Sequence, residues 1–424
     1  MAVSVQSECG RKTVSQKDWR EVPFADCFEP LRNNTYSRAV MTPTAGVANI
    51  HYGDVLVKYG EVLDFSTADV PSLLPGTTTV GDELRDGDIV IADTAEDETC
   101  GRAVEIANLG SRKAVSGLHT IACRPKPGLF VPGWLGYFMN SVSYHRQLVP
   151  LMAGIKVLSI SRAALKGTTI LVPPIAKQRQ IVAVFSECNR VVERLQKLLT
   201  AKKTRKRALL QQLFEPKSGM RLPKFSGPWT PATLKSIGDF EKGHGITNSQ
   251  CLSGDCPCIK YGDIYVCYDT HFSQVRSHTT ESVFRQSLRV EAGALLFTCS
   301  GEEPLDIGKC VVYTGTEPIA VGGDILVFHS HEHDPLFLAY QQQTSPLIRQ
   351  KAALAKGQSI FHIHLPEIQG LQVFVPPTIK EERVIAHTLL AADREIDGLA
   401  REIDAWKEKR KALSQLLLSG KVRV

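Results

Sequence analysis

The sequence lacks any uninterrupted apolar run of about 18 residues, the length that a helix needs to cross a bilayer. Residues 1–12 are polar and lack the apolar core of a secretory signal. We therefore expect neither a membrane-spanning helix nor export of the chain. Without export, the eleven cysteines are most simply free thiols in a reducing cytoplasm.

Nucleotide-binding loops are also missing, because neither G-x-G-x-x-G nor G-x-x-x-x-G-K-[S/T] occurs. Two Val-Pro-Pro runs faintly resemble the Asn-Pro-Pro-aromatic loop of amino-methyltransferases. However, Val172 and Val375 replace the asparagine that would bind the target amine, and Ile175 and Thr378 replace the aromatic residue. We therefore predict no catalytic residue and no cofactor site in this chain.

The composition is that of an ordinary globular protein, with 43% hydrophobic and 22% charged residues. A length of 424 residues predicts two or three domains. The net charge of +6 is unevenly spread, because residues 175–217 alone carry +8. This concentration argues against one large basic face for binding DNA.

The chain contains an internal repeat of about 200 residues, which indicates two homologous domains in tandem. Residues 154–184 align with residues 357–387 at a constant offset of 203 residues, with eight identical positions. Chance at ordinary composition would give about two. Weaker matches continue upstream: Trp19 with Trp229, Tyr52-Gly53-Asp54-Val55 with Tyr261-Gly262-Asp263-Ile264, and Gly101-Arg102-Ala103-Val104 with Gly308-Lys309-Cys310-Val311.

Each repeat has the same plan: short strands with turns, a helical stretch, a last strand ending at Val-Pro-Pro, and a long helix. We predict an α+β chain with two similar domains at 1–174 and 218–377 and long helices at 175–217 and 378–424. A helix of about 40 residues is roughly 60 Å long. Because each helix has only a narrow apolar stripe, it needs a partner, and the economical partner is the other helix.

These features resemble the specificity subunit of type I restriction-modification enzymes, over almost the whole chain. The marks are the following: Val172-Pro173-Pro174 with Lys177-Gln178-Arg179-Gln180-Ile181; the helix end at residues 206–214; Val375-Pro376-Pro377 with Lys380-Glu381-Glu382-Arg383-Val384; the helix end at residues 411–417; and Arg221-Leu222-Pro223-Lys224-Phe225 ahead of Trp229. The family often has Glu-Gln after the proline pair, where this chain has Lys177-Gln178 and Glu381-Glu382. This departure bears on the partner contacts and not on the architecture.

The resemblance implies a non-catalytic subunit in which each domain reads one half of a bipartite sequence in double-stranded DNA. The two helices would form an antiparallel coiled-coil spacer. Two methylation subunits would dock against it and carry S-adenosylmethionine, and restriction (translocase and nuclease) subunits with ATP and Mg²⁺ would join them. The residues expected in helix and partner docking are Pro173, Pro174, Gln178, Ile181, Leu209, Leu213, Pro376, Pro377, Val384, Leu413 and Leu417.

Base readers in such domains are polar, basic or aromatic residues on turns between strands. The paired position Arg102/Lys309 is the best basic candidate, because a glycine precedes it in both copies. Residues that follow an expected Tyr-Gly-Asp strand are further candidates, although ordinary surface placement explains each equally well. The full set of predicted DNA contacts is Lys58, Tyr59, Arg102, Arg112, Lys113, His244, Tyr265, Tyr268 and Lys309.

Other clusters have two interpretations. Residues 202–207 carry five positive charges and would contact phosphates or an acidic partner, or form a solvated helix face. Cys251, Cys256, Cys258 and Cys267 would bind zinc, but Cys256-Pro257-Cys258 has the wrong spacing, so free thiols are favoured. Alternating histidines (329, 331 and 333; 362 and 364) would share one face of a strand as ligands, although exposed strand histidines are commoner.

The leading hypothesis is therefore a module that reads DNA. The alternative is a scaffold of the same fold that has lost DNA recognition. A stand-alone enzyme is disfavoured by the missing cofactor loops.

Overall fold

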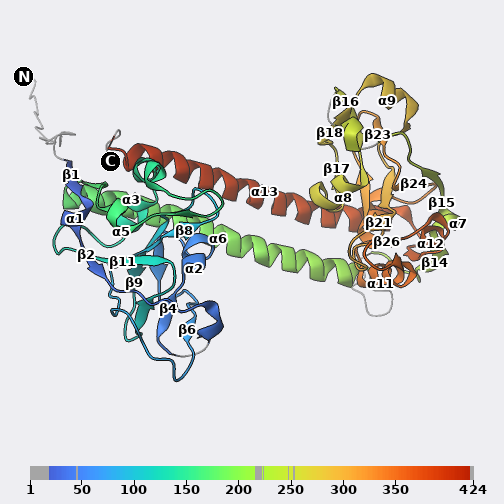
Figure 1. The fold of residues 1–424 in the computed structure, drawn as a ribbon. Helices are drawn as coiled ribbons and strands as arrows, with labels where there is room; N and C mark the ends of the chain where they lie inside the picture. The colour runs from blue at the N-terminus through green and yellow to red at the C-terminus, as the bar shows by residue number, and fades with distance from the viewer. Residues whose placement is uncertain are drawn as a thin grey trace, which may run out of the picture. The chain divides into compact units, whose positions relative to one another are not determined.

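The computed structural model describes residues 19–43, 46–214, 222, 224–246, 248–251 and 254–420. The chain divides into two compact units, one of Met1–Leu195 with Glu402–Val424 and one of Gln196–Arg401. Each unit holds one α/β domain and parts of two long helices, α6 (Ile175–Leu213) and α13 (Ile379–Leu417) (Figure 1). The predicted α+β fold, with two similar domains each followed by a long helix, is confirmed.

Each domain contains a five-stranded sheet, and the two sheets have the same topology. The strand order is β2-β11-β7-β9-β5 in the first domain and β15-β24-β20-β22-β17 in the second. Only the last pair of each sheet is parallel. The bounds are β2 Phe28–Leu31, β11 Thr120–Pro125, β7 Ile89–Ala92, β9 Ala103–Ala107, β5 Val62–Asp64, β15 Gly238–Lys242, β24 Ile325–Ser330, β20 Leu295–Thr298, β22 Cys310–Tyr313 and β17 His271–Phe272.

A four-stranded sheet packs beside each five-stranded sheet, with the order β10-β4-β6-β3 or β18-β16-β23-β19. Each of these sheets has one parallel pair, which is β10 with β4 at the edge of the first sheet and β16 with β23 in the centre of the second. The bounds are β10 Ala114–Ser116, β4 Ala48–Ile50, β6 Ser72–Leu73, β3 Met41–Thr42, β18 Ser277–Thr279, β16 Cys256–Ile259, β23 Ile319–Val321 and β19 Leu288–Val290.

A two-stranded sheet joins the start of each domain to its end. β1 (Arg20–Pro23) pairs with β13 (Thr169–Val172), and β14 (Thr230–Thr233) pairs with β27 (Gln372–Val375). This pairing places the tryptophan before each first strand against the domain core. The ring of Trp19 lies 6.1 Å from that of Trp134, and Trp229 lies 5.7 Å from Phe337.

Small strand pairs and short helices complete each domain. β8 (Thr94–Ala95) pairs with β12 (Leu158–Ser159), and β21 (Ser300–Gly301) and β25 (Lys356–Gly357) pair with β26 (Phe361–His362). The helices are α1 Phe24–Cys27, α3 Trp134–Met139, α4 Val142–Leu148, α5 Arg162–Leu165, α7 Leu234–Ile237, α9 Glu281–Gln286, α10 Pro335–Gln341, α11 Ser345–Leu354 and α12 Leu365–Gln369.

The Tyr-Gly-Asp run forms a helix in both domains, so the expected strand there is wrong. The helices are α2 (Tyr52–Val57) and α8 (Tyr261–Cys267). The residue before each helix is extended, and the first turn of each helix is capped locally. His51 accepts a hydrogen bond from the Gly53 amide, and the Asp263 carboxylate accepts one from the Lys260 amide. Such local capping at the first turn outweighs the β-like composition of the run.

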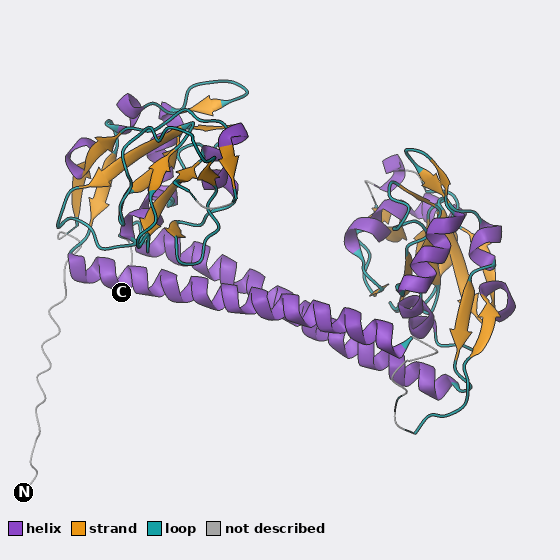
Figure 2. Cartoon of the chain, turned by 90° about the horizontal axis from the view of Figure 1, so that it is seen from below, coloured by secondary structure: helices purple, strands orange, loops and turns teal. Residues whose placement is uncertain are grey.

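Within each unit the two long helices lie side by side and antiparallel, as Figures 1 and 2 both show. In the first unit, Ile181 near the start of α6 and Leu417 near the end of α13 belong to one apolar core. In the second unit, Leu213 near the end of α6 and Ile385 near the start of α13 do the same. The predicted antiparallel packing is therefore confirmed. Gly398 lies inside α13 without breaking it.

In the part of the chain that the structure describes, no helix is both long and apolar enough to cross a membrane.

Candidate nucleic-acid interface

The paired basic residues Arg102 and Lys309 cap the same short helix in both domains. The Arg102 guanidinium donates to the carbonyls of Leu56 and Tyr59, at 2.7 and 3.1 Å. The Lys309 ammonium donates to the two equivalent carbonyls, of Tyr265 at 3.3 Å and Tyr268 at 2.6 Å. A cation at these carbonyls satisfies the exposed acceptors of a helix C-terminus. Base contact by either side chain stays a prediction, which this internal role disfavours.

The glycine before each cap is required by the backbone. Gly101 has a φ of +87° and Gly308 a φ of +65°, in the left-handed region that favours glycine. A Cβ on Gly101 would lie 2.6 Å from the side chain of Leu148, and one on Gly308 would lie 3.0 Å from that of Lys351. The Gly-Arg and Gly-Lys pairs are therefore parts of the scaffold.

The predicted contacts beside α2 and α8 are also held within their domains. Lys58 pairs with Asp69 at 3.6 Å, while Tyr59 is buried and its hydroxyl has no partner among the described residues. The Tyr265 hydroxyl hydrogen-bonds to Thr298 at 2.8 Å, and the Tyr268 ring stacks on Phe272 at 4.4 Å. The structure therefore gives these tyrosines packing roles.

The three remaining candidates lie on the surface. Arg112 donates to the carbonyl of Phe65 and covers its ring, 5.0 Å from the centroid. Lys113 is exposed, and its ammonium lies 3.9 Å from Glu83. His244 is exposed just beyond β15. Of these three, Lys113 and His244 keep side chains available to a ligand.

Gln178 fastens the start of α6 to its own domain. Its side chain is fully buried, accepts from the Val131 amide at 2.9 Å, and donates to the carbonyls of Leu129 and Pro173 at 2.9 and 2.8 Å. The side chain thus satisfies three buried backbone groups. Ile181 is buried one turn further on, and Pro173 is buried while Pro174 is partly exposed.

The second copy performs the same fastening with Glu382, which lies one position beyond the residue that the 203-residue offset pairs with Gln178. Its carboxylate accepts from the Asp334 amide at 2.7 Å and lies 2.7 Å from the His333 ring. α6 begins at Ile175 and α13 at Ile379, so the helices correspond at an offset of 204 residues and not 203. One extra residue separates Pro377 from the start of α13. The available signal of this insertion in the sequence was the apolar residue Ile385, one position after Val384.

The equivalence of Ile181 with Val384 is therefore wrong. Val384 is 43% exposed, whereas Ile385 is 2% exposed and lies in the core as Ile181 does. A shift of one residue turns a helix by about 100°, which moves the apolar stripe to the neighbouring position.

The C-terminal end of each long helix packs into a core cluster that holds one of the two tryptophans, Trp19 or Trp229. In the second unit, Leu209 and Leu213 belong to the cluster around Trp229. In the first unit, Leu413 and Leu417 belong to the cluster around Trp19. These four predicted docking residues thus bind helix to domain. In the run 221–225, Arg221 and Pro223 lie outside the described residues.

The basic run at residues 202–207 is partly neutralised within its unit. Lys202 pairs with Glu395, and Lys206 pairs with Asp393 and also with Asp269 at 3.1 Å. Lys203, Arg205 and Arg207 are exposed. Three of the five cations thus remain available for phosphates or an acidic partner.

The cysteine and histidine clusters do not converge. Among the described residues, no group of three or more His, Cys, Asp or Glu side chains is arranged to hold a metal ion. The sulfurs of Cys251 and Cys258 lie 3.9 Å apart, and burial raises the pKa of the Cys258 thiol to about 12. His331 pairs with Asp239 at 2.8 Å, and His333 contacts Glu382.

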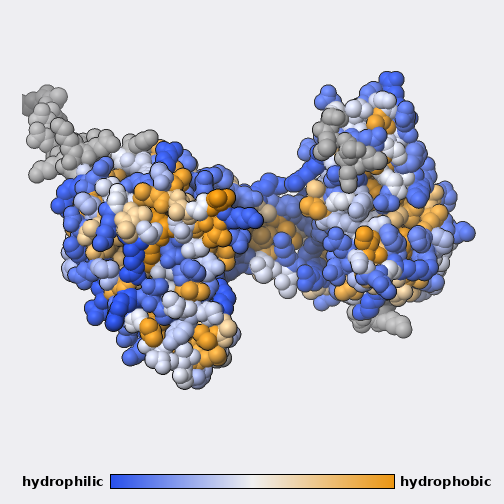
Figure 3. All heavy atoms as spheres, in the orientation of Figure 1, coloured by the Kyte–Doolittle hydropathy of each residue, from blue (hydrophilic) through white to orange (hydrophobic). Residues whose placement is uncertain are grey.

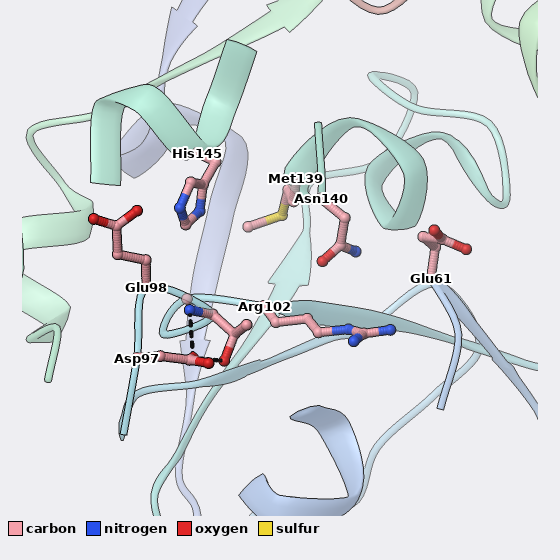
Figure 4. A pocket seen from close by; sticks show the side chains of 9 residues that line it. Glu61, Asp97, Glu98, Arg102, Met139, Asn140 and His145 are labelled. Atoms are coloured by element: carbon pink, nitrogen blue, oxygen red, sulfur yellow. Dashed lines mark hydrogen bonds between the residues drawn. The ribbon is translucent and has the colours of Figure 1, made fainter. Parts of the chain in front are cut away.

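A cavity of about 560 Å³ lies beside Arg102 in the first domain (Figure 4). Its rim carries Glu61, Asp97 and Glu98, and His145 from α4 points into it. In Figure 4, Arg102 lies between Asp97 and Glu61. The Thr99 amide donates to the Asp97 carboxylate at 2.9 Å. Three carboxylates make this cavity unsuited to phosphate, so it is no part of a DNA-backbone site.

The comparisons with known proteins agree with this fold. No protein-family model matches the chain. It is 21% identical to the MjaVIII type I restriction enzyme specificity subunit of Methanocaldococcus jannaschii, over 64% of this chain and 66% of that protein, just under two thirds of the relative. It is 21% identical to the MjaX specificity subunit of the same organism, over 96% of this chain and 94% of that protein.

Two solved structures share the fold along nearly the whole chain. The S subunit of a type I restriction-modification system from M. genitalium has a TM-score of 0.56 at 14% identity, covering 97% of this chain and 98% of that one. A chain from a study of complex assembly in a type I system has a TM-score of 0.59 at 15% identity, covering 96% and 98%. In sequence and in fold, the chain is therefore similar to specificity subunits of type I restriction-modification systems.

Proposed function

We propose that this chain is the DNA-reading subunit of a type I restriction-modification complex and that each domain reads one half of an asymmetric target in double-stranded DNA. One observation carries the proposal: the two domains keep the same strand order in their five-stranded sheets and the same cationic helix cap, but differ in exposed polar residues. A constant scaffold with changed surface groups is what two unlike half-sites require.

The chain itself is proposed to be non-catalytic. Methyl transfer, with S-adenosylmethionine, belongs to two methylation subunits, and cleavage, with ATP and Mg²⁺, belongs to restriction subunits. Because such a complex acts on chromosomal DNA, we propose that it works in the cytoplasm.

An exposed valine at the same position of both domains supports a partner that docks twice. Val57, at the end of α2, and Val266, in the last turn of α8, are each 85% exposed. Figure 3 shows hydrophobic residues scattered over an otherwise hydrophilic surface in both domains. A fully exposed apolar side chain retained in two diverged copies fits a repeated protein contact. Two methylation subunits, one for each domain, fit this repetition.

The test of DNA reading is long-read methylome sequencing of cells that express this chain with its methylation subunit, beside cells that lack only this chain. A methylated motif with two unlike half-sites and a fixed gap is expected only in the first. An assembled complex without any motif would contradict DNA reading and leave a scaffold of the same fold.

The test of docking is native mass spectrometry of complexes carrying Val57→Ser or Val266→Ser. Each single variant is expected to lose one of the two methylation subunits, and the double variant to lose both. Val80→Ser, at a position 47% exposed in the first domain only, is the matched control and should keep both. Unchanged stoichiometry in the double variant would contradict this docking site.

A further inference from the structure

At one edge of the first domain, an exposed histidine lies beside a threonine from a distant segment of the chain. His119 lies in the turn between β10 and β11, and its Nδ1 is 3.4 Å from the hydroxyl of Thr94, at the start of β8. The Asp93 amide donates to the His119 carbonyl at 3.1 Å, which fixes the turn beside the end of β7. The His119 side chain is 48% exposed. We call this edge of each five-stranded sheet the turn edge.

The second domain has the same arrangement at its turn edge, built from another segment. Ser300, at the start of β21, occupies the position of Thr94, and the Cys299 amide donates to the Asp324 carbonyl as Asp93 donates to that of His119. The imidazole on this hydroxyl belongs to His362 in β26, at 3.0 Å from Nδ1 to Oγ. His362 is exposed, and its ring stacks on that of His364.

We propose that these two imidazoles, His119 in the first domain and His362 in the second, contact base edges in the DNA and help to set the two half-sites. The proposal rests on the proposed function and names residues for it. The hydroxyl that orients the ring is retained, whereas the loop that supplies the ring differs. Because the hydroxyl keeps its place while the imidazole comes from a different segment, each domain presents its imidazole to the bases in its own geometry.

The contacts of Thr94 determine what His119 offers to a base. A hydroxyl carries one hydrogen, and Thr94 donates it to the Asp93 carboxylate at 2.8 Å. Thr94 therefore accepts from His119, so the ring carries its hydrogen on Nδ1, which also lies 3.5 Å from Asp93. In the neutral ring Nε2 is then an acceptor, with no partner among the described residues. Such an acceptor matches the exocyclic amino group of adenine or cytosine.

Backbone strain and nearby charge both favour a functional role for the turn edge. His119 has a φ of +53°, a conformation that costs energy in a residue other than glycine and that clusters at functional sites. The Tyr52 ring meets the imidazole edge-on, 5.3 Å away, and holds it in place. Exposed Arg162, at the start of α5, donates to Asn33, whose amide donates to the Gly117 carbonyl two residues before His119. Exposed Lys242, at the end of β15, acts electrostatically on Cys299, the neighbour of Ser300. Each turn edge therefore has a cation for phosphates.

The first experiment measures base preference with the purified complex of this chain and its methylation subunit. DNA duplexes carry one randomised half-site and one constant half-site, and bound DNA is sequenced. His119→Gly removes the ring while keeping a residue that adopts a positive φ without strain. It is expected to lower the preference for adenine or cytosine at one position of one half-site by about tenfold. His362→Ala should reduce selectivity in the other half-site, and exposed His278→Ala should change neither.

The second experiment uses the wild-type protein, so it does not depend on the folding of a variant. At each adenine or cytosine of the half-site, the amino group is replaced by hydrogen, and binding is measured. One such replacement should weaken wild-type binding about tenfold and have no effect on binding by His119→Gly. A wild-type complex that selects no sequence would contradict the proposed function itself. Selective binding that neither the variants nor the amino deletions alter would overturn only the role of these imidazoles.

Discussion

The first and second domains bury opposite charges on one scaffold. The first buries Glu105 in β9, where the second has Val312 in β22. The second buries Lys351 in α11, where the first has Leu148 at the end of α4. Glu105 accepts from the Gly133 and Gly136 amides, and Lys351 donates to the carbonyls of Gly308 and Gln342.

The scaffold therefore constrains backbone hydrogen bonding more than side-chain type. A buried charge is tolerated where free backbone groups of the opposite polarity meet it. By the same logic Arg102 and Lys309 both remain cations, because both face the carbonyls of a helix end.

Two variants near the start of α13 should differ most in stability, and they distinguish the two ways of aligning the long helices. Ile385→Ala should lower the free energy of unfolding by about 2–5 kcal/mol, because Ile385 fills the same core position as Ile181. Val384→Ala should cost less than about 0.5 kcal/mol, because that side chain is largely exposed. Urea unfolding of both variants measures the difference. Equal losses of unfolding free energy in the two variants would instead support the offset of 203 residues for the long helices.

Exchanging the two fastening residues should have unequal costs. Gln178→Glu leaves the Leu129 and Pro173 carbonyls without a donor and buries a charge, so it should cost about 2–3 kcal/mol. Glu382→Gln keeps an acceptor for the Asp334 amide and should cost about 1 kcal/mol. Thermal unfolding gives both values, and a larger loss for Glu382→Gln would contradict the assigned bonds.

Removing a helix cap should affect stability without affecting sequence choice. Arg102→Met and Lys309→Met each leave two carbonyls without their donor, at a cost of about 1–2 kcal/mol. The methylated motif should be unchanged in both variants, because both side chains are held against helix carbonyls within their own domains. A changed motif in a folded variant would revive the base-contact prediction for that residue.

The stabilities of the two units should depend on pH in opposite directions, and these effects should be the smallest. Burial raises the pKa of Glu105 to about 7, so the first unit should lose stability as the pH rises from about 4.5 to 7. Burial lowers the pKa of Lys351 to about 8, so the second unit should gain stability as the pH rises from about 8 to 10.5.

Hydrogen exchange of peptides from each domain measures these slopes. Glu105→Gln should flatten the acidic slope of the first unit alone, and Lys351→Met the alkaline slope of the second unit alone. Each slope should stay below about 1.4 kcal/mol per pH unit, which is the limit for a single titrating group. A variant that flattens both slopes would mean that the units do not unfold separately.

Repetition within the sequence was enough to establish two similar domains and two long helices that pack on each other. Matching Trp19 with Trp229 and Val-Pro-Pro with Val-Pro-Pro needs only the chain, and a narrow apolar stripe needs a partner helix. The Gly-Arg and Gly-Lys pairs were also visible, but their capping role was not, because it depends on which carbonyls the fold brings to them.

The register of the second long helix and the residues of the turn edge depend on tertiary contacts. Glu382 and Ile385 replaced the residues that alignment selected, since one inserted residue rotates every later side chain. Thr94 and His119 lie 25 positions apart and Ser300 and His362 lie 62 apart, so no local pattern predicts either pair. Sequence periodicity reports the burial of an element, whereas the convergence of polar groups from separate strands is set by sheet register.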